Sequence, residues 1–250
     1  IIATIFGIAT SLGLGANQIN SGLSYMGVIE GSFTNTVGII ILITLMGLVS
    51  VVLGLKVGIK ILSQINIVLC IIFLSFIFLA GPTSYILDGL VQNLGSYVQK
   101  LLSLSTSTQG YSDSSWQNAW TLYYYSWWFA WSPFVGLFIA RISYGRSIQE
   151  FLIGAVLVPT FIVFIWMGVF GNAAIYQEFI EPTSLSTAIN NDIAISLFIF
   201  LEQFPFSQLI MWLAIVIILT FFVTSSDSGA LVTSMLTAAK KENSKDEPPM

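Results

Sequence analysis

Long apolar runs alternate with short polar stretches along almost the whole chain. A helix needs about 20 residues to cross about 30 Å of hydrocarbon, and a window of that length finds six candidate runs. They lie near residues 1–25, 37–55, 61–80, 117–140, 148–170 and 207–235. The pattern therefore predicts an all-α membrane protein, a helical bundle with about six transmembrane helices.

Residues 85–102 follow a different pattern. Apolar side chains recur there at helical spacing, while Asp88, Gln92 and Gln99 fall off that stripe. This pattern is typical of an amphipathic helix that lies at the membrane interface. Residues 186–203 are predicted to form another helical segment outside the membrane, which ends before Pro205.

Composition supports a membrane protein and excludes several functions. The chain is 56% apolar and 8% charged, whereas soluble domains carry about 25% charged residues. It has no histidine and one cysteine, Cys70, which argues against zinc sites, imidazole chemistry and a disulfide framework. No basic cluster indicates nucleic acid, and no second acidic group accompanies Asp227 in a span, so we do not expect an enzyme.

Basic residues fall on alternate loops, which orients the predicted helices. By the positive-inside rule the following residues mark the cytoplasmic side: Lys56, Lys60, Arg141, Arg146, Lys240, Lys241 and Lys245. We expect a multi-pass protein of the cell membrane, namely a bacterial inner membrane. Because the chain begins inside an apolar run and ends in "KKENSKDEPPM", residues 1–250 are expected to form a single transmembrane domain that is incomplete at both ends.

The first apolar run carries a stripe of small residues, Ala3, Gly7, Ser11 and Gly15. Small side chains at every fourth position let another element approach closely. Polar residues in the same run, including Thr10 and Asn17, would be costly against lipid. We therefore expect this helix to lie in the interior of the bundle.

The fourth run contains three tryptophans, Trp127, Trp128 and Trp131, followed by Pro133. Trp131 precedes Arg141 by ten residues, or about 15 Å of helix, which is too deep for an interfacial aromatic belt. Three rings at this spacing can converge on one face, and the proline is expected to break the backbone there. The rings could form a cage for a quaternary ammonium ion or a packed helix interface.

The last run, "LTFFVTSSDSGALVTS", interrupts an apolar helix with hydroxyl side chains and with Asp227. Hydroxyl and carbonyl oxygens suit a hard cation such as sodium, but serine and threonine can equally bond back to their own helix. An ionisable residue inside a span is a functional candidate. Asp227 could serve in gating or could cap the local backbone.

These motifs resemble the betaine/choline/carnitine transporter family (BCCT). The similarity rests on "WWFAWSPFVGLFIARISYGRSIQEFLIGAVLVPT", "ATSLGLGANQINSGL", "FLAGPTSYIL" and "TFFVTSSDSGALV", which follow the family's order. The resemblance implies a secondary transporter of twelve spans, ten of which form two inverted repeats of the leucine-transporter type. The chain would be an internal fragment with spans five to ten, and thus a partial fold of that type.

The resemblance also implies roles for individual residues. Trp128 and Trp127 match the trimethylammonium box, and Trp131 matches a ring along the substrate path. Residues that match two sodium sites are Phe221, Thr224 and Ser225 for one, and Phe134, with Thr10 as a candidate hydroxyl, for the other. The remaining half of the aromatic box is not in this sequence.

The expected function is therefore sodium-coupled symport of glycine betaine or a related quaternary ammonium compound, by alternating access. Sodium-independent exchangers of the family carry a buried arginine, whereas Arg141 and Arg146 belong to a cytoplasmic loop. Substrate antiport of the carnitine or choline type is the alternative, and a membrane scaffold or receptor with a structural tryptophan cluster is another. The resemblance implies sodium as the coupling ion, no other cofactor, a lipid bilayer as surroundings, a homotrimer contacted partly through residues 85–102, and a role in osmoprotection.

Overall fold

The computed structural model describes residues 2–52, 60–111, 115–179 and 185–237, and these ranges are helical throughout apart from their connections. Two of the helical segments, η2 and η3, are π-helical. The elements are α1 (Ile2–Tyr25), α2 (Phe33–Val52), α3 (Lys60–Ala80), α4 (Thr83–Ser105), η2 (Gln117–Leu122), α5 (Tyr123–Ile142), α6 (Ile148–Leu152), η3 (Ile153–Leu157), α7 (Val158–Phe179), α8 (Leu185–Asn191), α9 (Ser196–Glu202) and α10 (Ser207–Thr237).

A helix forms at each of the six predicted membrane-spanning runs, and the all-α membrane bundle is confirmed. Within the described residues, five helical stretches are long and apolar enough to cross a membrane: α1, α2, α3, the run α6–η3–α7, and α10. The remaining predicted span, the fourth run, is formed by η2 and α5; it is helical but less apolar, because tyrosine, tryptophan and serine contribute little hydropathy. Its passage through the membrane stays a prediction. Residues 53–55 of the second predicted run lie outside the described residues.

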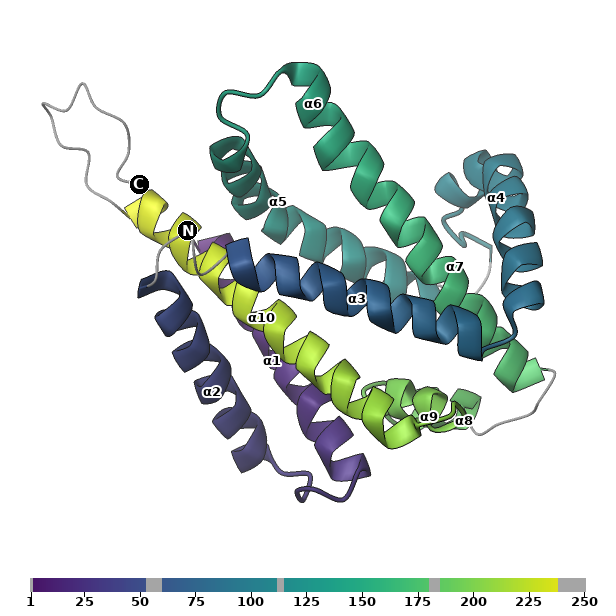
Figure 1. Ribbon diagram of the computed structural model, residues 1–250. Helices are drawn as coiled ribbons and strands as arrows, with labels where there is room; N and C mark the ends of the chain where they lie inside the picture. The colour runs from purple at the N-terminus through teal and green to yellow at the C-terminus, as the bar shows by residue number, and fades with distance from the viewer. Residues whose placement is uncertain (1, 53–59, 112–114, 180–184, 238–250) are drawn as a thin grey trace, which may run out of the picture.

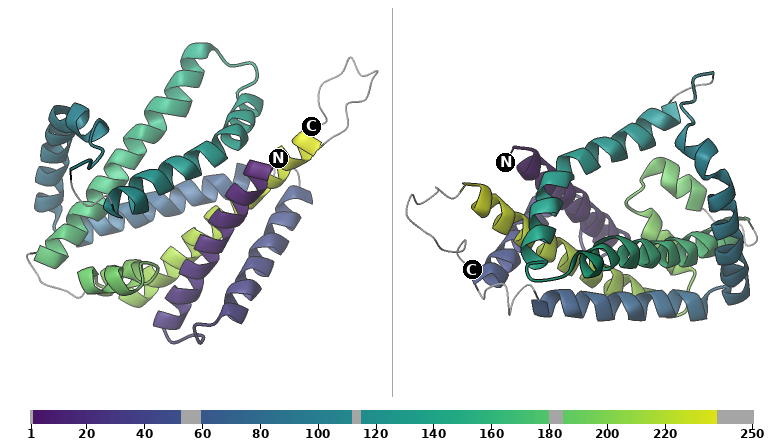
Figure 2. Two further views of the ribbon diagram at one scale, coloured as in Figure 1. Left: turned by 180° about the vertical axis from the view of Figure 1, so that it is seen from behind. Right: turned by 90° about the horizontal axis from the view of Figure 1, so that it is seen from above.

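The long helix α10 is the centre of the bundle. It packs along α1 and also contacts α2, α3, α5 and α9 (Figures 1 and 2). α7 packs against α3 and α4, so that α4 lies crosswise at the far end of α3 (Figure 1). The buried apolar side chains gather where α3, α9 and α10 meet, around Ile77, Phe198 and Met211.

The small residues of α1 accept aromatic rings from three other elements. A Cβ on Gly7 would lie 2.9 Å from Trp131 of α5, and one on Gly15 would lie 2.0 Å from the Phe222 ring of α10. A Cβ on Gly22 would lie 2.0 Å from the Phe198 ring of α9. We call these three places the glycine notches of α1. The predicted close approach is therefore made by side-chain rings, and Ala3, the first residue of the predicted stripe, is exposed.

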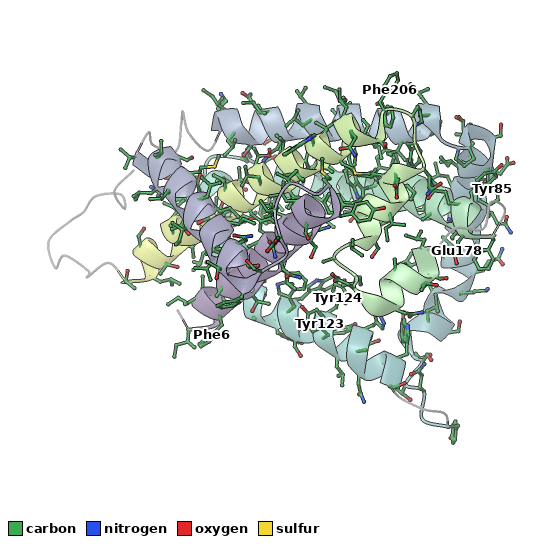
Figure 3. The ribbon with its side chains drawn as sticks, turned by 90° about the horizontal axis from the view of Figure 1, so that it is seen from below. Phe6, Tyr85, Tyr123, Tyr124, Glu178 and Phe206 are labelled. Atoms are coloured by element: carbon green, nitrogen blue, oxygen red, sulfur yellow. The ribbon has the colours of Figure 1, made fainter. Side chains whose placement is uncertain are left out.

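The predicted amphipathic segment 85–102 lies within α4, which is fastened to α7 by polar contacts. Asn93 donates a hydrogen bond of 3.2 Å to the side-chain oxygen of Asn172, whose amide nitrogen donates 2.7 Å to the Gly168 carbonyl. Tyr85 of α4, labelled in Figure 3, meets Tyr176 of α7 edge to face, with ring centroids 5.3 Å apart. The apolar side chains on the rest of α4 are largely exposed. Its position at a membrane interface stays a prediction.

The segment 186–203 forms two helices, α8 and α9, and the expectation of one continuous helix is wrong. The Asp192 carboxylate accepts a hydrogen bond of 2.9 Å from the backbone N–H of Ala194. Such a local bond competes with helix continuation. Glu202 at the end of α9 accepts a hydrogen bond from the Tyr25 hydroxyl, so the α8–α9 segment is fastened to the end of α1.

Candidate functional site

A ladder of aromatic rings runs along one face of η2 and α5. Residues three or four apart in a helix are neighbours on its surface, and the sequence places aromatic side chains at this spacing over five turns. Successive centroid distances are 6.2, 6.0, 6.5, 5.1 and 6.4 Å along Trp120, Tyr124, Trp127, Trp131, Phe134 and Phe138. Within the ladder, Trp131 lies against Gly7 of α1, the helix on which α5 packs.

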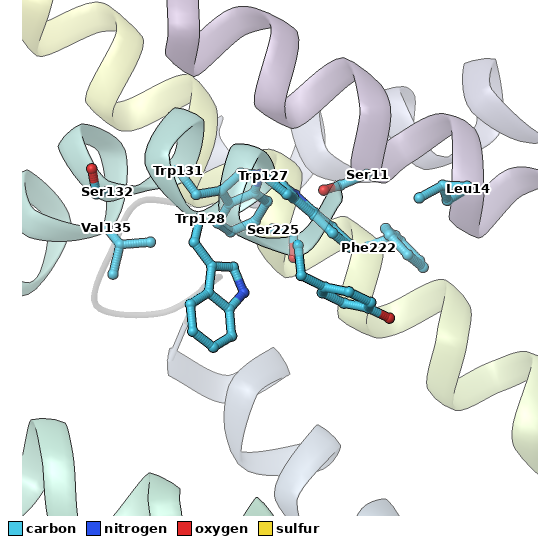
Figure 4. A pocket seen from close by; sticks show the side chains of 10 residues that line it. Ser11, Leu14, Trp127, Trp128, Trp131, Ser132, Val135, Phe222 and Ser225 are labelled. Atoms are coloured by element: carbon cyan, nitrogen blue, oxygen red, sulfur yellow. The ribbon is translucent and has the colours of Figure 1, made fainter. Parts of the chain in front are cut away.

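Trp128 stands apart from the ladder. Its side chain is 67% exposed, and its ring neighbour among the described residues is Tyr125, at 6.4 Å. Trp127 and Trp131, by contrast, meet edge to face at 6.5 Å. The spacing suggested that the three tryptophan rings converge on one face. The rings do not form one stacked cluster, but all three line one pocket (Figure 4).

This pocket, which we call the inner pocket, has a volume of about 650 Å³ and lies between α1, α5 and α10. It is lined by Ser11, Leu14, Tyr124, Trp127, Trp128, Trp131, Ser132, Val135, Phe222 and Ser225. Among the described residues, the lining holds hydroxyl groups, aromatic rings and two aliphatic side chains, and no charged side chain. Its volume falls in the range of small-molecule sites, about 300 to 1,000 Å³.

A second pocket, the outer pocket, has a volume of about 610 Å³ and lies between α1, the η2–α5 helix and the α8–α9 connection. It shares Leu14, Tyr124, Trp127 and Phe222 with the inner pocket. Asn17 and Gln18 add amide groups to its lining. Tyr123 and Tyr124 lie on the side of α5 that faces α1 and the α8–α9 segment (Figure 3). The two pockets are therefore neighbours separated by shared aromatic side chains.

Pro133 does not break α5, and the expected interruption is wrong. A proline cannot donate to the carbonyl four residues before it, here that of Phe129. The Ser132 hydroxyl donates to that carbonyl at 3.1 Å and replaces the missing bond. The helix continues through Pro133 to Ile142. The backbone oxygen beside the rings is thus occupied by a side chain from its own helix.

We expect Ser132→Ala to destabilise the full-length protein by about 1 kcal/mol, because the Phe129 carbonyl then loses its partner. Thermal unfolding of the purified protein in detergent would measure the change. Ser132→Thr keeps the hydroxyl and is the matched control. Equal stability of the alanine and threonine variants would contradict this account of the proline.

Of the three predicted sodium residues on α10, one lines the inner pocket. Ser225 lines the pocket. The Thr224 hydroxyl donates to the Phe221 carbonyl of its own helix at 2.8 Å, which leaves the lone pairs of the hydroxyl oxygen free to meet a cation. The Phe221 side chain is 44% exposed and is not part of the pocket lining. The structure brings together Ser225 and the tryptophans, and places Phe221 apart from them.

The predicted residues of the other sodium site, Phe134 and Thr10, lie on α5 and α1, and their joint role stays a prediction. Phe134 is buried and packs edge to face on Trp131 at 5.1 Å. Thr10 is exposed, and its hydroxyl donates to the Phe6 carbonyl at 2.9 Å. Thr10 therefore does not reach the pocket in this arrangement.

Two hydroxyl residues of α1 were not singled out as site residues from the sequence. Thr4 and Ser11 are buried, and neither side-chain oxygen has a hydrogen-bond partner among the described residues. They lie seven residues apart and so share one face of the helix. That spacing was the signal that could have identified them. Ser11 lines the inner pocket opposite the rings (Figure 4).

Comparison with known proteins agrees with the resemblance noted in the sequence. Residues 1–249 match the family described as BCCT, betaine/carnitine/choline family transporter. The chain is 45% identical to a glycine betaine transporter of Acinetobacter baylyi, over 97% of the chain and 37% of that protein. It is 40% identical to a glycine betaine/proline/choline transporter of Vibrio parahaemolyticus, over 96% of the chain and 43% of that protein.

An uncharacterized transporter of Mycobacterium tuberculosis is 44% identical over 95% of the chain and 40% of its own length. The chain thus spans less than half the length of these curated relatives. The family match extends over almost all of the chain, and the aromatic helix, the α1 hydroxyls and the α10 hydroxyls all fall within it. The chain belongs to the betaine/carnitine/choline transporter family, whose members are membrane transporters rather than enzymes.

Proposed function

We propose that the chain forms part of a sodium-coupled symporter for glycine betaine or a related quaternary ammonium compound. The observation that carries this proposal is the inner pocket, whose described lining residues supply indole rings and hydroxyl groups and no charged side chain. A quaternary ammonium head has no N–H to donate, so aromatic faces suit it better than carboxylates do. Its methyl groups also match an apolar lining.

Hydroxyl oxygens beside the rings support sodium as the coupling ion. Ser11 of α1 and Ser225 of α10 line the same pocket, and the Ser11 oxygen is without a hydrogen-bond partner among the described residues. Hard cations prefer oxygen ligands of this kind. Neutral oxygens also bind an ion without placing a fixed charge at membrane depth.

The two neighbouring pockets support transport by alternating access. The outer pocket opens beside the α8–α9 segment, and the inner pocket lies beyond the shared side chains Tyr124 and Trp127. A solute that passes from one pocket to the other would stay beside the Tyr124 and Trp127 rings, which line both pockets. Two of the relatives are named as transporters of glycine betaine, and one of these also of proline and choline. Assembly as a homotrimer stays a prediction from the resemblance.

Uptake of labelled glycine betaine by the full-length protein in proteoliposomes tests the proposal. We expect an inward sodium gradient to drive accumulation, and we expect replacement of sodium by potassium to abolish it. Ser225→Ala should raise the sodium concentration needed for half-maximal uptake, whereas Ser234→Ala, an exposed position further along α10, should not.

Each other result would favour a different function. Sodium-free exchange of carnitine or choline across the membrane would identify an antiporter and overturn the symport mechanism. An absence of binding for any quaternary ammonium compound would favour a scaffold or receptor whose rings serve only for packing.

A further inference from the structure

The inner and outer pockets meet at a wall of four side chains. Leu14 of α1, Tyr124 and Trp127 of α5, and Phe222 of α10 line both pockets. The pockets have volumes of about 650 and 610 Å³, and each is large enough for a small molecule. A solute that moves from one pocket to the other therefore has to pass between these four side chains.

Two of the wall side chains are held in place by the aromatic ladder of α5. Tyr124 stacks on Trp120 and on Trp127, at centroid distances of 6.2 and 6.0 Å. Trp127 also meets Trp131 edge to face at 6.5 Å. Either ring would have to break contacts with its neighbours in the ladder before it could move. We therefore look to Leu14 and Phe222 for a movable part of the wall.

Phe222 is the ring that α10 contributes to the wall, and it is seated in a recess of α1. A Cβ on Gly15 would lie 2.0 to 2.3 Å from three atoms of this ring, so the ring occupies the space that a side chain at Gly15 would need. The Phe222 side chain is half-buried and borders both pockets (Figure 4). A ring in a close-packed core has no such free volume beside it, whereas Phe222 can turn about its side-chain torsions into a pocket.

We propose that the Phe222 ring is the gate between the outer and inner pockets. While the ring occupies the notch at Gly15, it joins α10 to α1 and closes the wall. When the ring turns out of the notch, the wall opens between these two helices and a small solute passes. The use of this gate in transport rests on the proposed function, whereas the separation of the two pockets by Phe222 does not.

Asp227, the gating candidate of the sequence, lies elsewhere on α10. It is 0% exposed, and it lies against α2, where a Cβ on Gly47 would come within 3.0 Å of its Oδ1. It is not among the described residues that line either pocket. A role of Asp227 in gating stays a prediction, and the proposed gate does not depend on it.

Thiol labelling of the full-length protein in oriented membrane vesicles tests the gate without substrate or sodium. Val135→Cys reports on the inner pocket and Ala194→Cys on the outer pocket, because each residue lines only one of the two. Both are made in a background in which Cys70 and every other cysteine of the full-length chain are replaced by serine. The probe is a membrane-impermeant quaternary ammonium methanethiosulfonate, which is added on the side of the α8–α9 segment.

Phe222→Ala should raise the labelling rate of Val135→Cys about tenfold, which corresponds to a barrier lower by about 1.4 kcal/mol. The labelling rate of Ala194→Cys should not change. The matched control is Trp212→Ala, which removes a 45% exposed ring of α10 that lines neither pocket, and it should change neither rate. An unchanged rate at Val135→Cys would overturn the proposal. An equal rise at both reporters would also overturn it, because the whole bundle would then have loosened.

Phe222→Leu is a second variant, which removes the ring but keeps most of the apolar volume that packs on α1. We expect it to raise the labelling rate of Val135→Cys by a smaller factor than Phe222→Ala. It decides alone if Phe222→Ala fails to fold, and an unchanged rate would again overturn the gate. Labelling requires no transport, so a negative result here leaves the proposed symport intact, and uptake that does not need sodium leaves the gate intact.

Discussion

Trp128→Ala should raise the KM of full-length protein for glycine betaine about tenfold and leave folding intact. A desolvated cation–π contact contributes up to about 2 kcal/mol, and about 1.4 kcal/mol is a factor of ten in affinity. The Trp128 ring lines the inner pocket, yet it is 67% exposed and has little packing to lose. Initial rates of uptake at a series of substrate concentrations measure KM, and thermal unfolding measures stability.

The matched control is Trp116→Ala, which removes a ring that is 59% exposed and lines neither pocket. We expect its KM to equal that of the wild type. Trp128→Phe should give an intermediate value, because benzene rings bind cations less strongly than indoles. Equal KM values for Trp116→Ala and Trp128→Ala would show that Trp128 does not contact the substrate.

Gly22→Ala should destabilise the protein by about 3 kcal/mol or prevent folding. The new Cβ would lie 2.0 Å from the Phe198 ring, and Phe198 is 0% exposed. A ring enclosed on all sides has no free direction in which to move, and overpacking in such a core costs about 1–3 kcal/mol or more. Thermal unfolding and size-exclusion chromatography of the full-length protein would record the effect.

Gly13→Ala on the same helix is the matched control. A Cβ there meets nothing within 4 Å, and alanine favours a helix over glycine by about 0.5–1 kcal/mol. We therefore expect Gly13→Ala to be neutral or slightly stabilising. If both substitutions had the same effect, the notch at Gly22 would not be a determinant of the fold.

The membrane helices could be predicted because their signal is summed over many residues. Apolar runs of span length and the placement of basic residues located α1, α3 and α10 to within a few positions of their ends. The division of 186–203 into α8 and α9 could not be predicted in this way. It depends on one bond between Asp192 and Ala194, and a single local bond leaves no periodic pattern.

The site was predicted in outline by its residue types. The spacing of Trp127, Trp128 and Trp131 predicted that they share one site, and all three line one pocket. The spacing could not indicate that Trp128 has different ring neighbours from Trp127 and Trp131, because this depends on how each ring packs. Ser11, which was not predicted as a site residue, lines the pocket. The neighbouring Thr10 lies about 100° further around the helix and is exposed, and its role in a sodium site stays a prediction.

The effect of Pro133 on the α5 helix could not be predicted from the proline alone, because it depends on the hydroxyl of a neighbouring residue. The rule that proline interrupts a helix is a statement about one missing N–H. Here the Ser132 hydroxyl supplies a substitute donor to the Phe129 carbonyl. The continuity of α5 therefore depends on Ser132 and Pro133 together, and neither residue alone indicates it.

The glycine notches of α1 also bear on how the bundle can move. Rings from α5, α10 and α9 each occupy a recess at Gly7, Gly15 and Gly22. A ring that leaves its recess meets the side chains of the adjoining turns before it finds another opening, so gradual sliding along α1 is opposed. We expect these elements to shift against α1 in whole steps, between a few discrete arrangements, as packed interfaces do.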